Sequence, residues 1–261
     1  PSGMLAARQA ARAGARGIIV DEQNEFGGSL LASTKIIDGL KASSWVEKLV
    51  EELAKTKNVL MLPRSTAFGV YDHNFVAVVE RPTDHLGGSP PELCRERIHR
   101  VRAQQVVLAT GALERPLVFA HNDIPGVMLA SSVSAYLIRY GVAPGNRLLL
   151  FTTNDNAYQT AIDWHRSGRQ VVAVVDSRRN LSGAMYEAVR ALGIAVKSGH
   201  AVIEAEGSKR VRSARVASLS SKGSEIDSTS DRLDCDLIAC SGGWSPTIHL
   251  SSHTGSKPVW D

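Results

Sequence analysis

Two spacings of apolar residues divide this chain into expected helices and strands. Helical spacing predicts helices at 1–14, 44–55, 131–140, 157–166 and 181–192. Short apolar runs and two-residue alternation predict strands at 16–20, 59–62, 65–71, 74–80, 97–103, 106–108, 147–151, 171–175, 194–197, 201–206 and 210–219. A polar hairpin loop is expected at 220–232. Strands that alternate with helices predict an α/β fold.

Two groups of these elements have the outline of nucleotide-binding βαβ units. In the first, the helix at 1–14 and the strand at 16–20 lead to Asp21; in the second, a strand, a helix and the strand at 171–175 lead to Asp176. The repetition predicts two Rossmann-like FAD/NAD(P)-binding domains, the second inserted into the first, with a β-meander. The expected divisions are 1–117 for the first domain, 118–234 for the inserted domain without a Gly-rich turn, and 235–261 for the return to the first domain.

The acidic residues after the first predicted strand have the spacing of a ribose ligand. Asp21 follows Gly3 by 18 positions and Glu22 by 19, close to the ~20 that separate a phosphate-binding glycine turn from the acid that binds the ribose. Ser2 and Gly3 would then be the end of a Gly-x-Gly-x-x-Gly turn, and both chain ends look like those of a fragment. An acid favours NAD or FAD over NADP. An ordinary surface acid after an ordinary strand remains the alternative, and Asp21 and Glu22 remain rival ribose ligands.

Two further stretches have small residues where a ligand could approach the backbone. The loop at 26–29 pairs two glycines ahead of Ser29, which predicts a flexible passage beside a dinucleotide. The apolar run at 106–108 predicts a buried strand that ends in the small-residue turn Thr110-Gly111. This turn is either a phosphate-binding turn or the crossover where the chain leaves the first domain beneath the dinucleotide.

The turn of the second unit differs from that of a nucleotide-binding unit. Side chains occupy 152–157 where glycines would be needed, and Asp155 would repel a pyrophosphate. We therefore expect this unit to keep the fold and to bind no nucleotide by the usual route. Asp176 is interpreted as a polar residue that ends a strand.

Composition limits the remaining classes of function. The chain has 261 residues, 43% of them hydrophobic, and a net charge of +4 with acids and bases interspersed, which argues against a nucleic-acid groove. No apolar run reaches the ~20 residues of a membrane helix. The three cysteines lack metal-binding spacing, and Cys235 and Cys240 are too far apart for a redox Cys-x-x-Cys pair. We expect a cytoplasmic protein with no metal site and no catalytic side chain in this segment.

Several stretches together resemble a known family. They are Val20-Asp-Glu-Gln23 with Phe26-Gly-Gly-Ser29, Phe68-Gly-Val-Tyr-Asp-His-Asn74, Ala109-Thr-Gly-Ala-Leu-Glu-Arg-Pro116 with Asp123-Ile-Pro-Gly-Val127, Thr153-Asn-Asp-Asn-Ala-Tyr158 and Ser241-Gly-Gly-Trp-Ser-Pro246. They resemble flavoproteins of the disulfide reductase type and, more closely, α subunits of heterotetrameric sarcosine oxidases. Opine oxidases and cyanide-forming amine oxidases share the Ala-Thr-Gly-Ala-x-Glu-Arg-Pro pattern and remain competitors.

The resemblance implies a multi-subunit oxidoreductase that converts sarcosine to glycine and formaldehyde and forms peroxide. Its amine substrate and FAD belong to a β-type partner, an FMN lies at the α/β interface, γ- and δ-type subunits complete the assembly, and NAD is held by the α subunit. The implied NAD contacts are Ser2, Asp21, Glu22, Gln23, Ser29 and, through its backbone, Ala67. With Gly3, Thr110 and Gly111 they make the full set of expected cofactor-binding residues.

Two departures from the family pattern bear on activity. The upstream Gly-x-Gly and the family's folate-binding region are absent from these 261 residues, so we expect this chain alone neither to bind NAD tightly nor to turn over substrate. Two other hypotheses are a self-contained FAD/NAD(P)H-dependent reductase and a scaffold that keeps its nucleotide for structural reasons.

Overall fold

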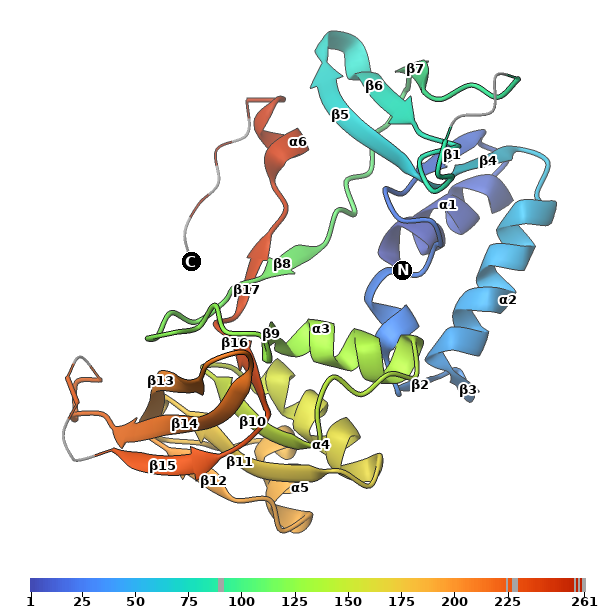
Figure 1. Cartoon of the computed structure of the whole chain (residues 1–261). Helices are drawn as coiled ribbons and strands as arrows, with labels where there is room; N and C mark the ends of the chain where they lie inside the picture. The colour runs from blue at the N-terminus through green and yellow to red at the C-terminus, as the bar shows by residue number, and fades with distance from the viewer. Residues whose placement is uncertain (89–91, 224, 227–229, 256, 258, 260–261) are drawn as a thin grey trace. The chain divides into compact units, whose positions relative to one another are not determined.

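The computed structural model describes residues 1–88, 92–223, 225–226, 230–255, 257 and 259, which form parts of two compact units (Figure 1). Unit 1 comprises Pro1–Gly111 and Pro246–Asp261, and unit 2 comprises Ala112–Ser245. Unit 2 is thus inserted into unit 1, as the predicted fold requires. The divisions differ from the expected 117 and 235, because the chain leaves unit 1 at Gly111 and returns to it at Pro246.

Unit 1 is built on a two-stranded parallel sheet of β1 (Gly17–Val20) and β4 (Val59–Leu62). Helices α1 (Ser2–Arg12) and α2 (Ala42–Lys55) pack against it. Apolar residues of α2 at helical spacing meet the small-residue face of α1 and one face of β1. The resulting core consists of Met4, Ile19, Phe26, Val46, Leu49 and Leu53.

The predicted meander forms the second layer of unit 1. Strands β5 (Ser65–Tyr71), β6 (Phe75–Glu80) and β7 (Arg97–Arg102) pair antiparallel in chain order. The turn between β5 and β6 holds His73 in the left-handed region, with φ of 58°. A short hairpin of β2 (Ile36–Ile37) and β3 (Leu40–Lys41) precedes α2. Helix α6 (His249–Ser252) lies against β5.

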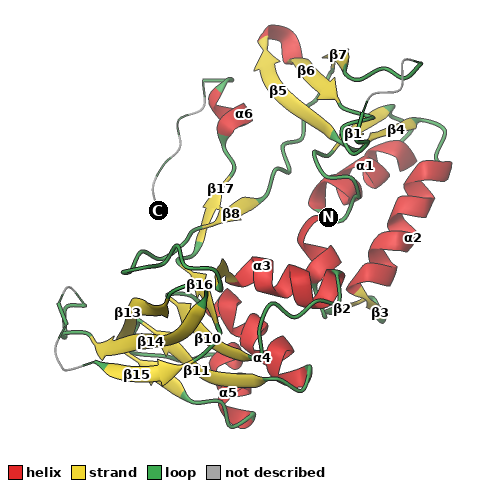
Figure 2. Cartoon of the chain, in the orientation of Figure 1, coloured by secondary structure: helices red, strands yellow, loops and turns green. Residues whose placement is uncertain are grey.

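The strand predicted at 106–108 is wrong. Figure 2 draws the chain between β7 and the next strand as a loop, and Val107 and Leu108 are 68% and 41% exposed. An apolar run becomes a strand only where another strand accepts its hydrogen bonds. No strand within the described residues pairs with it.

The core of unit 2 is a five-stranded parallel sheet in the order β12, β11, β10, β16, β9. The strands span β9 (Val127–Leu129), β10 (Arg147–Thr152), β11 (Gln170–Asp176), β12 (Val196–Ser198) and β16 (Leu237–Ser241). Strand β16 belongs to the segment that the sequence analysis assigned to the first domain. Its apolar run fits between β10 and β9 because both sheet faces are covered there.

Two layers cover this parallel sheet (Figure 2). The helical layer contains α3 (Ala130–Ser134), which continues as a π-helix over Ala135–Arg139, with α4 (Tyr158–Arg166) and α5 (Ala184–Ala191). The other layer is the antiparallel sheet of β13 (His200–Gly207), β14 (Val211–Ser218) and β15 (Asp231–Asp234). The predicted loop at 220–232 therefore ends in a strand, and residues 224 and 227–229 lie outside the described part.

The continuous apolar run of β10 follows from this burial on both faces. Leu148 and Leu150 contact the core under the helices, whereas Leu149 and Phe151 contact the core under the antiparallel sheet. A strand with one exposed face would alternate with polar residues instead. At the ends of unit 2, β8 (Ala112–Glu114) pairs with β17 (Trp244–Pro246). None of the described helices is long and apolar enough to cross a membrane.

Candidate functional site

The carboxyl end of β1 holds Asp21 by three backbone hydrogen bonds. The Asp21 N–H donates to Leu62 O at 3.0 Å, and Ser65 N–H donates to Asp21 O at 2.9 Å. The N–H of Gln23 donates to Oδ1 of Asp21 at 3.0 Å. Carboxylate Oδ2 has no hydrogen-bond partner among the described residues, so one oxygen remains as an acceptor.

The carboxyl group of Asp21 is half-buried, which shifts its proton affinity. Burial raises the pKa of Asp21, the neighbouring charge of Glu22 raises it further, and the N–H of Gln23 opposes both. The chain thus holds a carboxylate where its charged form is costly. Glu22 itself is exposed and has no partner among the described residues.

The first turn of α1 lies at the same end of β1. Pro1 lies near Asp21, and a Cβ on Gly28 would lie 3.2 Å from Cδ of Pro1. No side chain caps the start of α1, so its first N–H groups, which carry the positive end of the helix dipole, are left without a side-chain acceptor. Free amides beside an acid are what a dinucleotide requires.

The loop after β1 depends on Gly27. Its φ is 139°, and a Cβ there would lie 2.8 Å from side-chain atoms of Leu31 and Val46. The glycine therefore lets the loop press onto α2 and then turn past Pro1 at Gly28. Ser29 follows on the surface, in a short 3-10 helix over Gly28–Ala32. The passage of 26–29 beside a dinucleotide stays a prediction.

The structure brings together only part of the expected set. Ala67 lies in β5, two residues beyond Ser65, which is bonded to Asp21. Thr110 and Gly111 instead bond the returning segment, because Thr110 Oγ1 donates to Thr247 O at 2.7 Å and Gly111 O accepts from Thr247 N–H at 3.0 Å. They are described better as the exit from unit 1 than as a ligand turn.

Ala109 is a residue of this region that the sequence analysis missed. Its Cβ lies 3.3 Å from where a Cβ on Gly3 would be, so the segment before Thr110 runs past the start of α1. A small residue directly after an apolar run is the only signal the sequence offered. Together, Ser2 and Gly3, Asp21 to Gln23, Gly28 and Ala109 line one edge of unit 1.

At the corresponding edge of unit 2, the side chains form hydrogen bonds and ion pairs with one another. Arg178 Nη2 donates to Asp176 Oδ2 and to Asp155 Oδ1, each at 2.7 Å, and Tyr158 OH donates to Asp176 Oδ2 at 2.8 Å. Asp176 is fully buried. The hydrogen bond that Arg178 donates to Asp176 raises the pKa of Arg178, while burial and then the separate hydrogen bond from Tyr158 OH to Asp176 raise the pKa of Tyr158.

This network corrects one sequence interpretation. Asp176 ends a strand, as expected, but it is also a buried centre of hydrogen bonds. Asp155 is paired with Arg178, which also pairs with Asp176, so one cation is shared by two carboxylates. The ends of β10 and β16 are also joined, because Asn154 Nδ2 donates to Ser241 O at 3.2 Å and to Ser241 Oγ at 2.9 Å. An incoming nucleotide would have to break these contacts.

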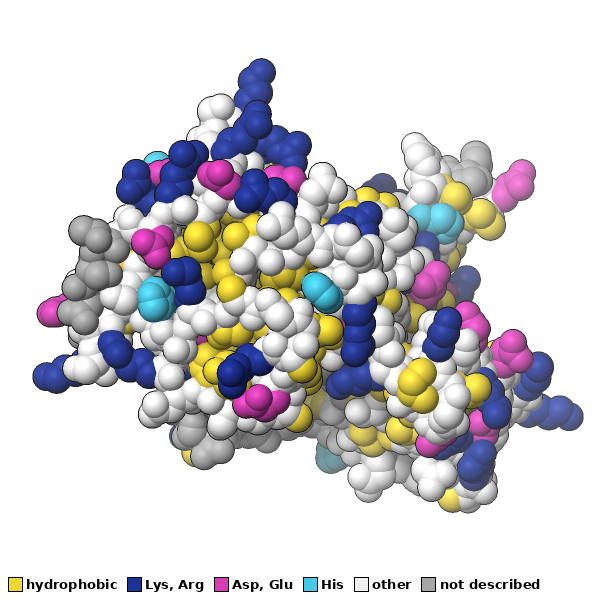
Figure 3. Space-filling model, turned by 90° about the horizontal axis from the view of Figure 1, so that it is seen from below, with side chains coloured by type: hydrophobic (Ala, Val, Ile, Leu, Met, Phe, Trp, Pro, Cys, Tyr) yellow, Lys and Arg dark blue, Asp and Glu magenta, His cyan; other side chains and the backbone are white. Residues whose placement is uncertain are grey.

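The other candidate groups are less suited to chemistry. Burial raises the pKa of the Cys235 thiol to about 12 and also raises that of Cys240, so neither is a ready nucleophile at neutral pH. No group of three or more His, Cys, Asp or Glu residues in the described part of the chain could hold a metal. On the surface seen in Figure 3, basic and acidic side chains are interspersed.

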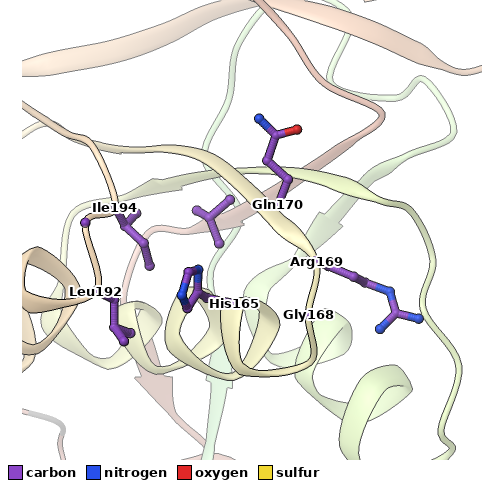
Figure 4. A pocket seen from close by; sticks show the side chains of 8 residues that line it. His165, Gly168, Arg169, Gln170, Leu192 and Ile194 are labelled. Carbon is purple, nitrogen blue, oxygen red and sulfur yellow. The ribbon is translucent and has the colours of Figure 1, made fainter.

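A shallow recess in unit 2 lies away from this edge. It has a volume of about 520 Å³, and its lining includes His165, Arg169, Leu192 and Ile194. Figure 4 shows the Arg169 side chain extending away from the other labelled residues. The recess lies where α4 ends and β11 begins, at the amino end of the parallel sheet, opposite the end where such sheets bind nucleotides.

Comparisons with known proteins agree with this architecture. The sequence profile for "Pyridine nucleotide-disulphide oxidoreductase" matches residues 1–258. The chain is 44% identical over 264 residues to sarcosine oxidase subunit alpha of Corynebacterium sp. strain P-1, covering 100% of this chain and 27% of that protein. Hydrogen cyanide synthase subunit HcnB of Pseudomonas protegens is 23% identical over 278 residues, with 98% of this chain and 57% of that protein covered.

A solved structure shows the same fold. Thioredoxin reductase of Lactococcus lactis superposes with a TM-score of 0.72 at 18% identity, covering 98% of this chain and 78% of that one. At that identity the likeness concerns the fold alone. The chain spans about a quarter of the length of the sarcosine oxidase subunit that it matches.

Proposed function

Because this chain belongs to the pyridine nucleotide-disulphide oxidoreductase family, we propose that it is the NAD-binding part of the α-type subunit of a multi-subunit sarcosine oxidase. The observation that carries the proposal is the edge of unit 1 where the uncapped start of α1, the acceptor oxygen of Asp21 and the Gly27–Gly28 loop meet. The 44% identity to a sarcosine oxidase subunit, against 23% to a cyanide synthase subunit, favours the sarcosine-type enzyme.

The residues of this edge fit a dinucleotide. Asp21 Oδ2 would accept hydrogen bonds from the adenosine ribose hydroxyls, and the first N–H groups of α1 would face the pyrophosphate. Gly28 lets the loop pass the dinucleotide without a side chain in the way, and Ser29 offers a hydroxyl group. The backbone of Ala67 lies in β5, the strand that follows β4 in the chain. NAD would supply a nicotinamide ring that can carry a hydride, and the residues here bind and orient it.

The proposed reaction belongs to the assembly. Sarcosine, oxygen and water would give glycine, formaldehyde and hydrogen peroxide, with the amine and FAD on a β-type partner, FMN at the interface with that partner, and γ- and δ-type subunits completing the enzyme. The chain's own part is nucleotide binding and assembly, with no catalytic side chain. Its free thiols suit a cytoplasmic protein.

The alternatives predict different behaviour. A related opine, amine or cyanide-forming oxidase would share the nucleotide edge and differ in the amine that reduces the flavin. A stand-alone FAD/NAD(P)H reductase needs a second nucleotide site or a reactive cysteine pair. The Asp155–Arg178 pair occupies that edge of unit 2, and Cys235 is buried with a raised pKa, which speaks against that alternative. A scaffold that only stores NAD would leave flavin reduction unchanged when NAD is lost.

Two measurements test the proposal. The full-length protein, co-expressed with its partner subunits, is denatured and the released nucleotides are identified by mass spectrometry. We expect NAD in a ratio of about one per α-type chain, and recovery of none would rule out the binding role. Anaerobic flavin reduction by sarcosine, compared with opines and glycine, then tests the substrate.

A further inference from the structure

The antiparallel sheet of β5, β6 and β7 in unit 1 has one edge that is contacted and one that is open. Helix α6 lies against β5, where the Val70 N–H donates to Nδ1 of His253 at 3.4 Å. At the other edge, β7 pairs with β6 alone among the described residues. An edge strand of this kind is accessible to another polypeptide chain.

The basic side chains of β7 divide between the two faces of the sheet, because alternate residues of a strand point to opposite faces. Arg97 and His99 share a face with Glu80, and both contact its Oε2, at 3.0 and 2.8 Å. Arg100 and Arg102 point to the opposite face and are exposed. The described residues provide neither of them with an ion pair. Two positive charges about 7 Å apart along the strand therefore lie without a counter-charge.

Apolar and aromatic groups lie on the same face as these two arginines. Cross-strand partners share a face, so three rows make up what we call the basic face: Tyr71–Phe75–Arg102, Gly69–Ala77–Arg100 and Thr66–Val79–Ile98. None of these residues is acidic. Tyr71 and Ile98 are 53% and 59% exposed. The Arg102 guanidinium lies 5.8 Å from the centre of the Phe75 ring. Tyrosine and arginine beside apolar side chains are typical of the centres of protein interfaces.

We propose that the basic face binds an acidic segment of a partner subunit. Carboxylates of that segment pair with Arg100 and Arg102. Its apolar side chains cover Tyr71 and Ile98. Charge complementarity selects this occupant, because the two cations lie on a face that has no acid of its own. A single-stranded nucleic acid fits less well, since its bases stack on successive aromatic rings, whereas the other strongly exposed apolar group here is the aliphatic Ile98. The proposal rests on the multi-subunit assembly proposed above and is independent of the nucleotide and the amine.

Protection of the sheet edge is the other explanation of arginines on β7. Charged side chains keep the edge strands of neighbouring molecules from pairing, and an acid does so as well as a base. Replacing Arg100 by Glu therefore separates the two roles. The substitution preserves a charged edge, but it places a negative charge against the acidic segment of the partner.

The association of the full-length α-type chain with its partner subunits tests the proposal. We expect Arg100→Glu to raise the dissociation constant at least about 10-fold, because like charges then face each other. Arg100→Lys keeps the charge and raises the dissociation constant less. Arg16→Glu makes the same change of charge at another exposed position of unit 1, and it leaves the association unchanged. Added salt weakens the association of the parent more steeply than that of Arg100→Glu.

The outcomes separate this proposal from the proposed function. If the parent assembles and Arg100→Glu associates equally well, this proposal is wrong and the proposed function stands. A parent that forms no complex contradicts the multi-subunit assembly, and both proposals fall. A lower melting temperature for the isolated full-length Arg100→Glu chain than for Arg16→Glu would show that the protein's own polypeptide covers the face. Nucleic acid that copurifies with the parent and not with Arg100→Glu would assign the face to nucleic acid, and either of these results overturns the proposal.

Discussion

Replacing Asp21 by Asn separates the binding role of this carboxylate from its structural role. Asparagine keeps an oxygen for the Gln23 N–H at 3.0 Å, so the local backbone is preserved. It removes the negatively charged carboxylate, which would accept hydrogen bonds from the ribose hydroxyls. A hydrogen bond to a charged group contributes about 1.5–3 kcal/mol, so NAD affinity falls about 10- to 150-fold.

The same substitution lowers NAD affinity but raises the stability of the nucleotide-free protein. Burial raises the pKa of Asp21, so the folded state holds the Asp21 proton more tightly than the unfolded state does. Stability therefore falls as the pH rises from the ordinary aspartate pKa through the raised one, and the loss persists at neutral pH. The nucleotide-free Asp21→Asn variant melts at a higher temperature than the parent at pH 7, and the difference closes in acid.

The assay uses full-length protein freed of nucleotide, with calorimetry for NAD affinity and thermal unfolding at several pH values. Glu22→Gln is the matched control, because Glu22 is exposed and adjacent. It removes only the repulsion between Glu22 and Asp21, so it raises the melting temperature less than Asp21→Asn does and weakens NAD binding less. If Glu22→Gln lost affinity while Asp21→Asn retained it, the assignment of Asp21 as the ribose ligand would be wrong.

Three further changes test other parts of the structure. Gly27→Ala adds a methyl group 2.8 Å from two side chains at a φ of 139°, and it lowers the free energy of unfolding by about 2–4 kcal/mol. The control Gly14→Ala, with open space around it, lowers it by about 1 kcal/mol. Equal unfolding free energies for the two variants would contradict the packing of the loop. Arg178→Ala leaves the fully buried carboxylate of Asp176 without a cation. It lowers the free energy of unfolding by about 2 kcal/mol, less than for a buried pair because Arg178 is 37% exposed. Arg190→Ala, in a surface pair, lowers it by less than about 0.5 kcal/mol, and chemical denaturation measures both. Alkylation at pH 7 followed by peptide mapping labels the exposed Cys94 in the folded protein and the two buried cysteines only after denaturation; labelling of the buried thiols in the native state would refute their burial.

Local patterns were enough to locate most elements of the fold. The helical spacing at 44–55 predicted α2, and the alternation at 65–71 and 74–80 predicted β5 and β6, because these signals depend on residues close in sequence. The 106–108 segment failed for the opposite reason. Its composition suits a buried strand, but a strand requires a neighbour, and the described part of the chain provides none.

Part of the candidate site could likewise be predicted from the sequence, and part could not. Asp21, the glycines at 27–28 and the start of α1 could be found from spacing, because a strand followed by an acid is a short-range pattern. The contact of Ala109 with Gly3 joins residues more than a hundred positions apart, and no local signal announces it. The ion pair of Arg178 with Asp155 likewise joins the ends of adjacent strands, whereas the pair of Arg178 with Asp176 lies within two residues of sequence.

The sequence alone determined most of the longer helices and strands, where an acid follows a strand, and that the second unit lacks a glycine turn. Periodicity and backbone conformational preference fix these features within a few residues. The tertiary structure decided that β16 belongs to unit 2, that Arg178 occupies the second nucleotide edge, and that Val107 lies in solvent. These outcomes depend on which distant segments meet, because strand pairing and charge burial are settled only when the partners come together.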